Sequence, residues 1–134
     1  MLFRSDRDFR VLYVETLRPW QIGSHMAEAQ EMAADVLLSA MDFYFEDRRA
    51  VPLPSTAEEG EVAVELPAST FAKVLLLNTM LEQGVSNAEL ARRMGTRPQE
   101  VQRIVNLEHA TKIDTIAAAL RQLGKNLQLQ LQPL

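Results

Sequence analysis

Two short capped segments joined by Gly95 restrict the fold of this chain more than any other feature. Ser86 and Glu89 stand three residues apart, the spacing of a capping box in which Ser86 caps a helix and Glu89 reaches back. Gly95 follows where a tight turn needs a residue free to take positive φ. Thr96 is expected to cap a second short helix, where Pro98 is tolerated because the first amides lack intrahelical partners. The pattern predicts two short helices about a tight turn, the helix-turn-helix arrangement.

Each of these two helices is predicted to have an apolar side and a polar side. The apolar residues recur three and four positions apart, as in amphipathic helices. They are Leu90, Ala91 and Met94 in the first helix, and Val101, Ile104 and Val105 in the second. The second helix of this arrangement enters the major groove of double-stranded DNA. Because glutamine can bond adenine bidentately and arginine can fork onto guanine, we assign Gln99, Gln102 and Arg103 to base edges.

Other polar residues of this region are predicted to contact the DNA backbone. Helix starts and basic side chains bind phosphate well, so Ser86, Asn87, Arg97 and Lys112 are predicted to contact phosphate groups. Glu100 either accepts from a cytosine amino group or pairs with a neighbouring arginine, and the sequence does not choose between these roles. The predicted DNA-binding residues are Ser86, Asn87, Arg97, Gln99, Glu100, Gln102, Arg103, Asn106 and Lys112. The alternative is an ordinary helical hairpin with a solvated polar face.

Further helices are predicted on both sides of this pair, over residues 69–83 and 114–124. Gly84 can supply a left-handed stop for the first of them. In the tail, Leu127, Leu129 and Leu131 alternate with glutamines, which is typical of an amphipathic strand. Such a strand needs a partner, so we expect these leucines to pair two copies of the chain, since two-fold dimers suit two half-sites. The alternative is pairing with a sheet in the N-terminal half.

The N-terminal half has a different pattern. Alternating apolar residues predict strands over 9–14 and 62–66, and a short strand over 19–23. Between them, a long apolar stripe predicts a helix from Ser24 to about Asp47–Arg49, with an aromatic cluster at 43–45 placed in the core. The expected fold class is therefore α+β: a sheet-plus-helix domain over residues 1–67, then an all-α helix-turn-helix domain over 68–134 that ends in a strand.

The charge changes sign along the chain. Residues 1–68 hold 6 basic and 13 acidic residues, whereas residues 69–134 hold 8 basic and 5 acidic ones. The basic half suits phosphates and the acidic half suits a basic protein, although a small imbalance can also serve solubility alone.

Several classes of function are disfavoured. The chain has no cysteine, and its two histidines have no ligand-spaced partner, so no metal or cofactor is expected. Asp42 and Glu46 lie four apart, as carboxylates of a nuclease could, but a charged face of an amphipathic helix is the more usual explanation, so no enzyme is predicted. The N-terminus has no apolar run of a signal peptide and no segment is long enough to span a membrane, so a cytoplasmic location is expected.

Several ungapped runs resemble the HicB family of antitoxins, from HicA–HicB toxin–antitoxin modules. The resemblance covers roughly residues 9–132. Its clearest segments are Met41–Asp47, Val51–Pro54, Val64–Pro67, Lys73–Asn78, Glu89–Arg93 and His109–Asp114. The family pattern has a full extra strand and a glycine-containing hairpin before the segment that matches 9–15, whereas only residues 1–8 precede it here. Either the first strand is lost or replaced, or the start of the chain is unusual.

The resemblance implies a degraded RNase H-like N-terminal domain that binds the HicA toxin, a small basic ribonuclease. It also implies a C-terminal repressor-like domain that binds the promoter of its own operon. The acidic face expected to contact the toxin comprises Glu46, Glu61 and Glu65. The sequence thus predicts an antitoxin that neutralises an mRNA-cleaving toxin and represses its own operon. The alternative is a stand-alone repressor whose N-terminal domain only dimerises or binds another ligand.

Overall fold

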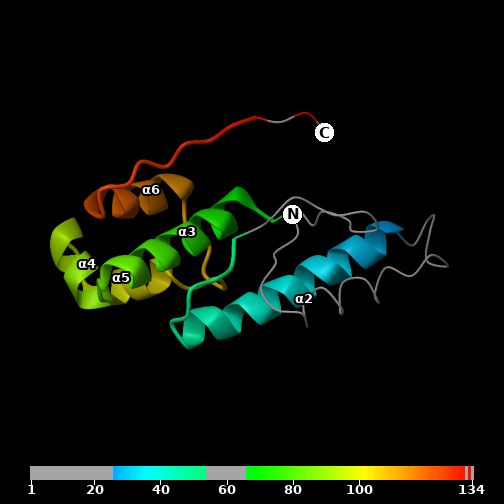
Figure 1. Ribbon diagram of the computed structural model, residues 1–134, viewed down its shortest axis with the longest axis horizontal. Helices are drawn as coiled ribbons and strands as arrows, with labels where there is room; N and C mark the ends of the chain where they lie inside the picture. The colour runs from blue at the N-terminus through cyan, green and yellow to red at the C-terminus, as the bar shows by residue number, and fades with distance from the viewer. Residues whose placement is uncertain (1–25, 54–65, 132, 134) are drawn as a thin grey trace. The chain divides into compact units, whose positions relative to one another are not determined.

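The computed structural model describes residues 26–53, 66–131 and 133 of the chain (Figure 1). The described residues form five helices, which are α2 (Met26–Glu46), α3 (Ala68–Gln83), α4 (Asn87–Met94), α5 (Pro98–Ile104) and α6 (Ile113–Gln122). The helices predicted in the sequence are all present, with ends that differ from the prediction by one or two residues where both are described. Contacts divide the chain into two compact units, Met1–Pro67 and Ala68–Leu134.

The predicted α+β class is wrong for the part of the chain that the structure describes, because that part contains helices and no strand. The strands expected over 9–14 and 19–23, and nearly all of that over 62–66, lie outside the described residues. The C-terminal strand is contradicted directly, since residues 125–131 form neither helix nor strand. Alternation of apolar residues yields a strand only when a second strand supplies hydrogen bonds, and the described residues supply none.

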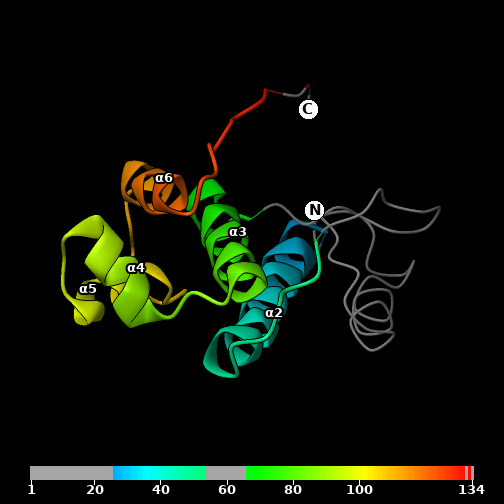
Figure 2. The same cartoon turned by 60° about the vertical axis from the view of Figure 1, so that its left-hand side comes forward.

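The second unit is a small helical bundle. Helix α3 packs along α6, and α4 packs against both α5 and α6 (Figure 2). The four helices share one apolar core. Its buried members are Ala72, Leu76, Met80, Val85, Leu90, Ala91, Val101, Ile104, Ile116, Ala119, Leu120 and Leu123. Burying about a dozen side chains of this kind supplies the main driving force for folding the unit.

Helix α3 buries residues on more than one of its sides. The residues that it contributes to the shared core are Ala72, Leu76 and Met80. Val74 and Leu77 are buried as well. Helix α3 is apolar nearly all round, so its sequence does not single out one face.

Hydrogen bonds fix the C-terminal end of α6 in the bundle. At its C-terminal end, Gln83 of α3 donates from Nε2 to the carbonyl oxygen of Leu123 (2.8 Å). Lys125 then donates its backbone amide to the carbonyl oxygen of Leu120 (3.0 Å), and Gly124, two residues after the end of the helix, has a φ of 74°. These bonds satisfy carbonyl groups that the end of a helix leaves without partners.

Helix α2 combines buried and exposed apolar residues. Met41 and Tyr44 are buried, whereas Phe43 is 63% exposed, so the predicted core position of Phe43 is wrong. Two residues after the end of the helix, Arg48 has a positive φ (49°). The guanidinium of Arg49 lies 4.6 Å from the ring centroid of Tyr44, which is a cation–π contact.

None of the described helices is both long and apolar enough to cross a membrane.

Candidate nucleic-acid interface

The first helix of the predicted pair begins as the sequence indicates. Ser86 has extended backbone angles and its Oγ accepts a hydrogen bond from the amide of Glu89 (3.1 Å), which confirms the N-cap. Helix α4 ends at Gly95 with a φ of 69°, in the left-handed region. The amide of Thr96 then bonds back to Ala91 (2.9 Å). These local bonds turn the chain sharply into the next helix.

The second helix of the pair, α5, starts one residue later than predicted. Its N-cap is Arg97, and that side chain makes no capping bond, so the predicted cap at Thr96 is wrong. Pro98 occupies the first turn as expected, where its missing amide hydrogen costs nothing. Val101 and Ile104 are buried in the shared core. Because this side is held against the bundle, the opposite side of α5 is left to solvent.

The exposed side of α5 carries the residues that sequence analysis assigned to base edges. Gln99, Gln102 and Arg103 are all exposed. Glu100 is exposed as well, and its Oε1 lies 3.6 Å from Nη1 of Arg103. Of the two roles left open for Glu100, pairing with a neighbouring arginine is therefore the one present in the free protein. Both side chains are more than half exposed, so this ion pair is weak and easily exchanged for another partner.

The remaining predicted DNA-binding residues lie around the ends of α4, α5 and α6. Ser86 and Arg97 are exposed N-cap residues, and Asn87 is half-buried at the start of α4. Lys112 is the exposed N-cap residue of α6. Asn106 follows α5, and its side-chain oxygen accepts the amide of Glu108 (2.9 Å), which gives it a structural role as well.

A cavity of about 290 Å³ lies next to the exposed side of α5. Its walls come from the end of α4, from α5 and from the segment that leads into α6. Its polar and charged lining residues are Thr96, Glu100, Arg103, His109, Thr111, Lys112 and Thr115. Three segments that are separate in the sequence thus place basic and hydroxyl groups around one hollow.

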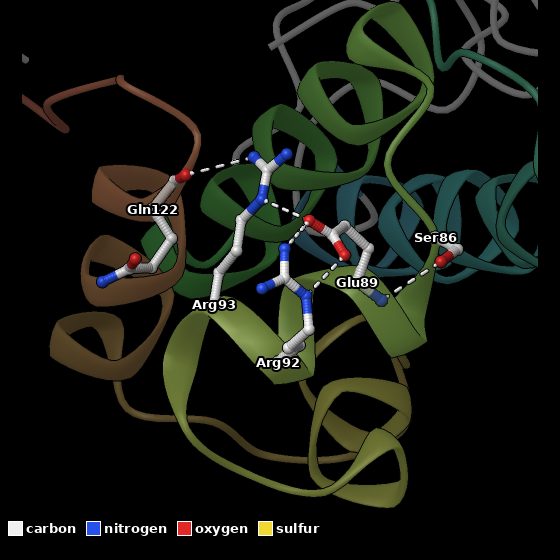
Figure 3. Close-up of polar contacts among 5 residues, drawn as sticks. All are labelled: Ser86, Glu89, Arg92, Arg93 and Gln122. Carbon is white, nitrogen blue, oxygen red and sulfur yellow. Dashed lines mark hydrogen bonds and ion pairs between the residues drawn. The ribbon is translucent and has the colours of Figure 1, made fainter.

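The outer side of α4 carries a network of charges that sequence analysis did not foresee (Figure 3). The Glu89 carboxylate accepts hydrogen bonds from Nη2 of Arg92 (2.6 Å), Nε of Arg92 (2.9 Å) and Nε of Arg93 (3.0 Å). The hydrogen bonds from Arg92 and then Arg93 lower the pKa of Glu89 from 4.5 to about 2. The same bonds raise the pKa of Arg92. The capping box is therefore half confirmed: Ser86 caps, but the Glu89 carboxylate is held by arginines.

Arg93 extends this network to the last helix. Its Nη1 reaches the carbonyl oxygen of Gln122 (3.4 Å), near the C-terminal end of α6 (Figure 3). A positive charge is favourable at this end of a helix. A signal was present in the sequence, because Glu89 and Arg93 are spaced four apart, the order in which such pairs stabilise helices.

Comparison with known proteins identifies the family. Residues 6–75 match the family described as HicB-like antitoxin of bacterial toxin–antitoxin systems, and residues 77–130 match a helix-turn-helix family. Antitoxin HicB of Escherichia coli K12 is 46% identical over 121 residues, which cover 90% of this chain and 88% of that protein. The chain belongs to the HicB-like antitoxin family.

Two further relatives agree with this assignment. Antitoxin HicB 2 of Photorhabdus laumondii is 65% identical over 107 residues, or 80% of this chain and 76% of that protein. Antitoxin HicB of Pseudomonas fluorescens is 42% identical over 111 residues, or 82% and 76%. The resemblance drawn from the sequence is confirmed, and the protein is a HicB-like antitoxin with a helix-turn-helix DNA-binding domain.

The residues predicted to bind the toxin are only partly described. In this HicB-like antitoxin, Glu46 is exposed at the end of α2, whereas Glu61 and Glu65 lie outside the described residues. Asp35 is exposed and Asp42 is half-buried on the same helix. Within the described ranges, no group of three or more His, Cys, Asp or Glu side chains is placed to hold a metal ion.

The predicted dimerisation residues lie in the tail after α6. Leu127 packs against the shared core. Leu129 and Leu131 are 73% and 99% exposed. The tail thus starts on the bundle and leaves it, as the extended segment in Figure 1 shows.

Proposed function

We propose that this HicB-like antitoxin neutralises a HicA-type mRNA-cleaving toxin and represses its own operon by sequence-specific DNA binding. The observation that carries the second role is the exposed polar face of α5, held by Val101 and Ile104 against the shared core. The first role rests on membership of the family and on the acidic N-terminal half.

For DNA recognition, α5 enters the major groove and presents Gln99, Gln102 and Arg103 to base edges. Exposed amide and guanidinium groups on one side of a short helix are the groups that read adenine and guanine. On contact, Arg103 exchanges its weak pair with Glu100 for a base. The free energy by which a well-placed bidentate contact favours the correct base is larger than the free energy that an exposed ion pair contributes to stability.

The DNA backbone is held at helix starts and by basic residues. Ser86 and Asn87 begin α4, Arg97 begins α5 and Lys112 begins α6. Amides at helix starts point toward phosphate and the helix dipole favours its charge. These contacts would fix the register of α5 without reading sequence.

For toxin binding, we assign the acidic face of Glu46, Glu61 and Glu65. Residues 1–68 carry 13 acidic and 6 basic residues, a balance that attracts a basic ribonuclease. The antitoxin acts by covering the toxin's active site and supplies no catalytic group of its own.

For operator binding we propose a dimer that buries Leu127, Leu129 and Leu131 between copies. Leu129 and Leu131 are apolar side chains exposed to solvent. Burying them against the same residues of a second copy removes their apolar surface from water, which is favourable. A two-fold dimer presents two copies of α5 to two half-sites.

The test of the DNA-binding role is Arg103→Ala, measured by fluorescence anisotropy on promoter DNA and on variants with each base pair changed. We expect a loss of about 1–3 kcal/mol at one base position, with relaxed specificity there. Arg121→Ala is the matched control, because Arg121 is an exposed arginine in the last turn of α6. Equal weakening on all sequences would place Arg103 on phosphate, and no binding of promoter DNA by the unaltered protein would contradict the repressor role.

The test of the toxin-binding role is co-purification of the full chain with the product of the adjacent gene. We expect a small basic protein to bind tightly, and charge reversal of Glu46 to weaken that binding at low salt. If promoter DNA binds but no such partner does, the protein is a stand-alone repressor.

A further inference from the structure

Helix α3 buries one charged side chain. Lys73 is 2% exposed, and it is the one charged residue in the buried set of the described chain. It lies in an apolar run, between Ala72 and Val74, both of which are buried. A buried ammonium is costly unless it is hydrogen-bonded, so its presence here requires partners.

Those partners belong to the segment between α5 and α6. Lys73 Nζ donates to the carbonyl oxygen of Asn106 (2.6 Å) and to the carbonyl oxygen of His109. The two acceptors are 33 and 36 residues away from Lys73 in the sequence. Hydrogen bonds from a charged donor are roughly twice as strong as neutral ones.

The turn also has short-range hydrogen bonds of its own. The amide of His109 bonds to the carbonyl of Asn106 (3.2 Å), and the hydroxyl of Thr111 bonds to the carbonyl of His109 (3.4 Å). These bonds shape the turn itself. Lys73 adds a connection to α3, since its ammonium reaches the turn from that helix.

The turn leads directly into the predicted phosphate contact. Lys112 follows His109 by three residues, and both line the cavity beside α5 together with Arg103. A displacement of the turn would therefore move Lys112 relative to the face of α5.

Packing alone does not explain the lysine. Burial lowers the pKa of Lys73, so the site disfavours the charged form. A methionine would fill similar space without that cost. The ammonium is stabilised here by two carbonyl oxygens outside the helix, those of Asn106 and His109.

We propose that Lys73 is a positioning residue for DNA recognition: by holding the turn at Asn106 and His109, it sets the position of Lys112 relative to α5. The inference rests on the proposed DNA binding and adds a residue that does not itself touch DNA. Lys73 acts through Lys112, so the two residues are coupled in operator affinity.

The experiment is a double-mutant cycle in the full-length chain with Lys73→Met, Lys112→Met and the double variant, read by anisotropy on promoter and scrambled DNA over a range of salt. We expect Lys73→Met to weaken promoter binding by about tenfold, the scale of one lost charged hydrogen bond. The magnitude of the slope of the logarithm of the binding constant against the logarithm of the salt concentration should fall by about one, as for loss of one phosphate contact. Lys112→Met should then cost much less in the Lys73→Met background than in the unaltered protein.

The matched control is Gln83→Met, which removes a different side-chain hydrogen bond from α3 to a distant carbonyl, that of Leu123. It should lower the unfolding midpoint without changing promoter affinity or salt slope. Any of three results would overturn the inference. They are additive effects of Lys73→Met and Lys112→Met, promoter binding by Lys73→Met that equals that of the unaltered protein, and a weakening of promoter binding by Gln83→Met as large as that by Lys73→Met. If Lys73→Met does not fold, Lys73→Gln takes its place in the cycle with the same criteria. Failure of the unaltered protein to bind promoter DNA would instead contradict the proposed function.

Discussion

Helix α2 differs from the short helices α4 and α5 in how many of its apolar residues are exposed to solvent. The 21 residues of α2 include Met32, Val36 and Phe43, which are all exposed and fall on one side of the helix at 3.6 residues per turn. Helices α4 and α5 have 8 and 7 residues, and neither exposes a large apolar side chain. Helices this short are unstable alone. They form here because the bundle buries their apolar sides, and Ser86 also caps the start of α4, whereas a longer helix tolerates an exposed apolar face.

The largest expected effect compares a buried with an exposed apolar residue. Leu90→Ala, in the core of the bundle, should lower the free energy of unfolding by about 2–5 kcal/mol, because it removes contacts and leaves a cavity. Phe43→Ala should change it by less than about 0.5 kcal/mol, since Phe43 is mostly exposed. Urea unfolding of both variants measures the difference. A large loss for Phe43→Ala would break the comparison, by showing that this face of α2 is covered in solution.

A smaller effect is expected at the helix starts. Ser86→Ala should cost about 1 kcal/mol, because the Oγ bond to the amide of Glu89 is lost. Thr96→Ala is the matched control and should cost much less, since the N-cap of α5 is Arg97 and makes no side-chain bond. Thermal unfolding of the two variants compares them. Equal costs would mean that Thr96 caps α5 in solution.

The smallest expected effect concerns the charges on α4. The pKa of Glu89 is about 2 in the folded protein against an ordinary value of 4.5, so the unfolded chain binds the proton more readily. The stabilisation from Glu89 is therefore present above about pH 4.5 and is lost as the pH falls toward 2. NMR titration of the side-chain carboxyl carbon should give a midpoint near 2.

The stability difference between Glu89→Gln and the unaltered protein should likewise shrink as the pH falls through this range. Asp47→Asn serves as the control, because Asp47 pairs with Arg49 at 3.4 Å with both side chains more than half exposed. That variant should change stability little at any pH. A Glu89 midpoint near 4.5 would show that the arginine bonds do not persist in solution.

Much of the candidate interface was predictable because its signals are local. The Ser86 cap, the left-handed Gly95 and the proline that opens α5 each depend on a few neighbouring residues. The apolar spacing of Val101 and Ile104 then fixes which side of α5 faces solvent, since one face must be buried. The family was also recognisable, because long ungapped runs preserve residue order.

Other features required the fold. Helix α3 could have buried several faces, and contact with α6 selected Ala72, Leu76 and Met80. Glu89 had the spacing for both a capping box and pairs with arginines, and the folded helix shows the arginine pairs. The leucines of the tail alternate as in a strand, but the described residues give them no strand to pair with.

By itself, the sequence determined the order of the helices, the turn between α4 and α5, and the exposed side of α5, since caps, backbone angles and helical spacing act within a few residues. Only the tertiary structure decided the buried face of α3, the tail and the burial of Lys73. Each of these depends on partners far away in the chain, and Lys73 meets its acceptors 33 and 36 residues further on. Local sequence is compatible with several such sets of contacts, and the packing of the whole unit determines which set forms.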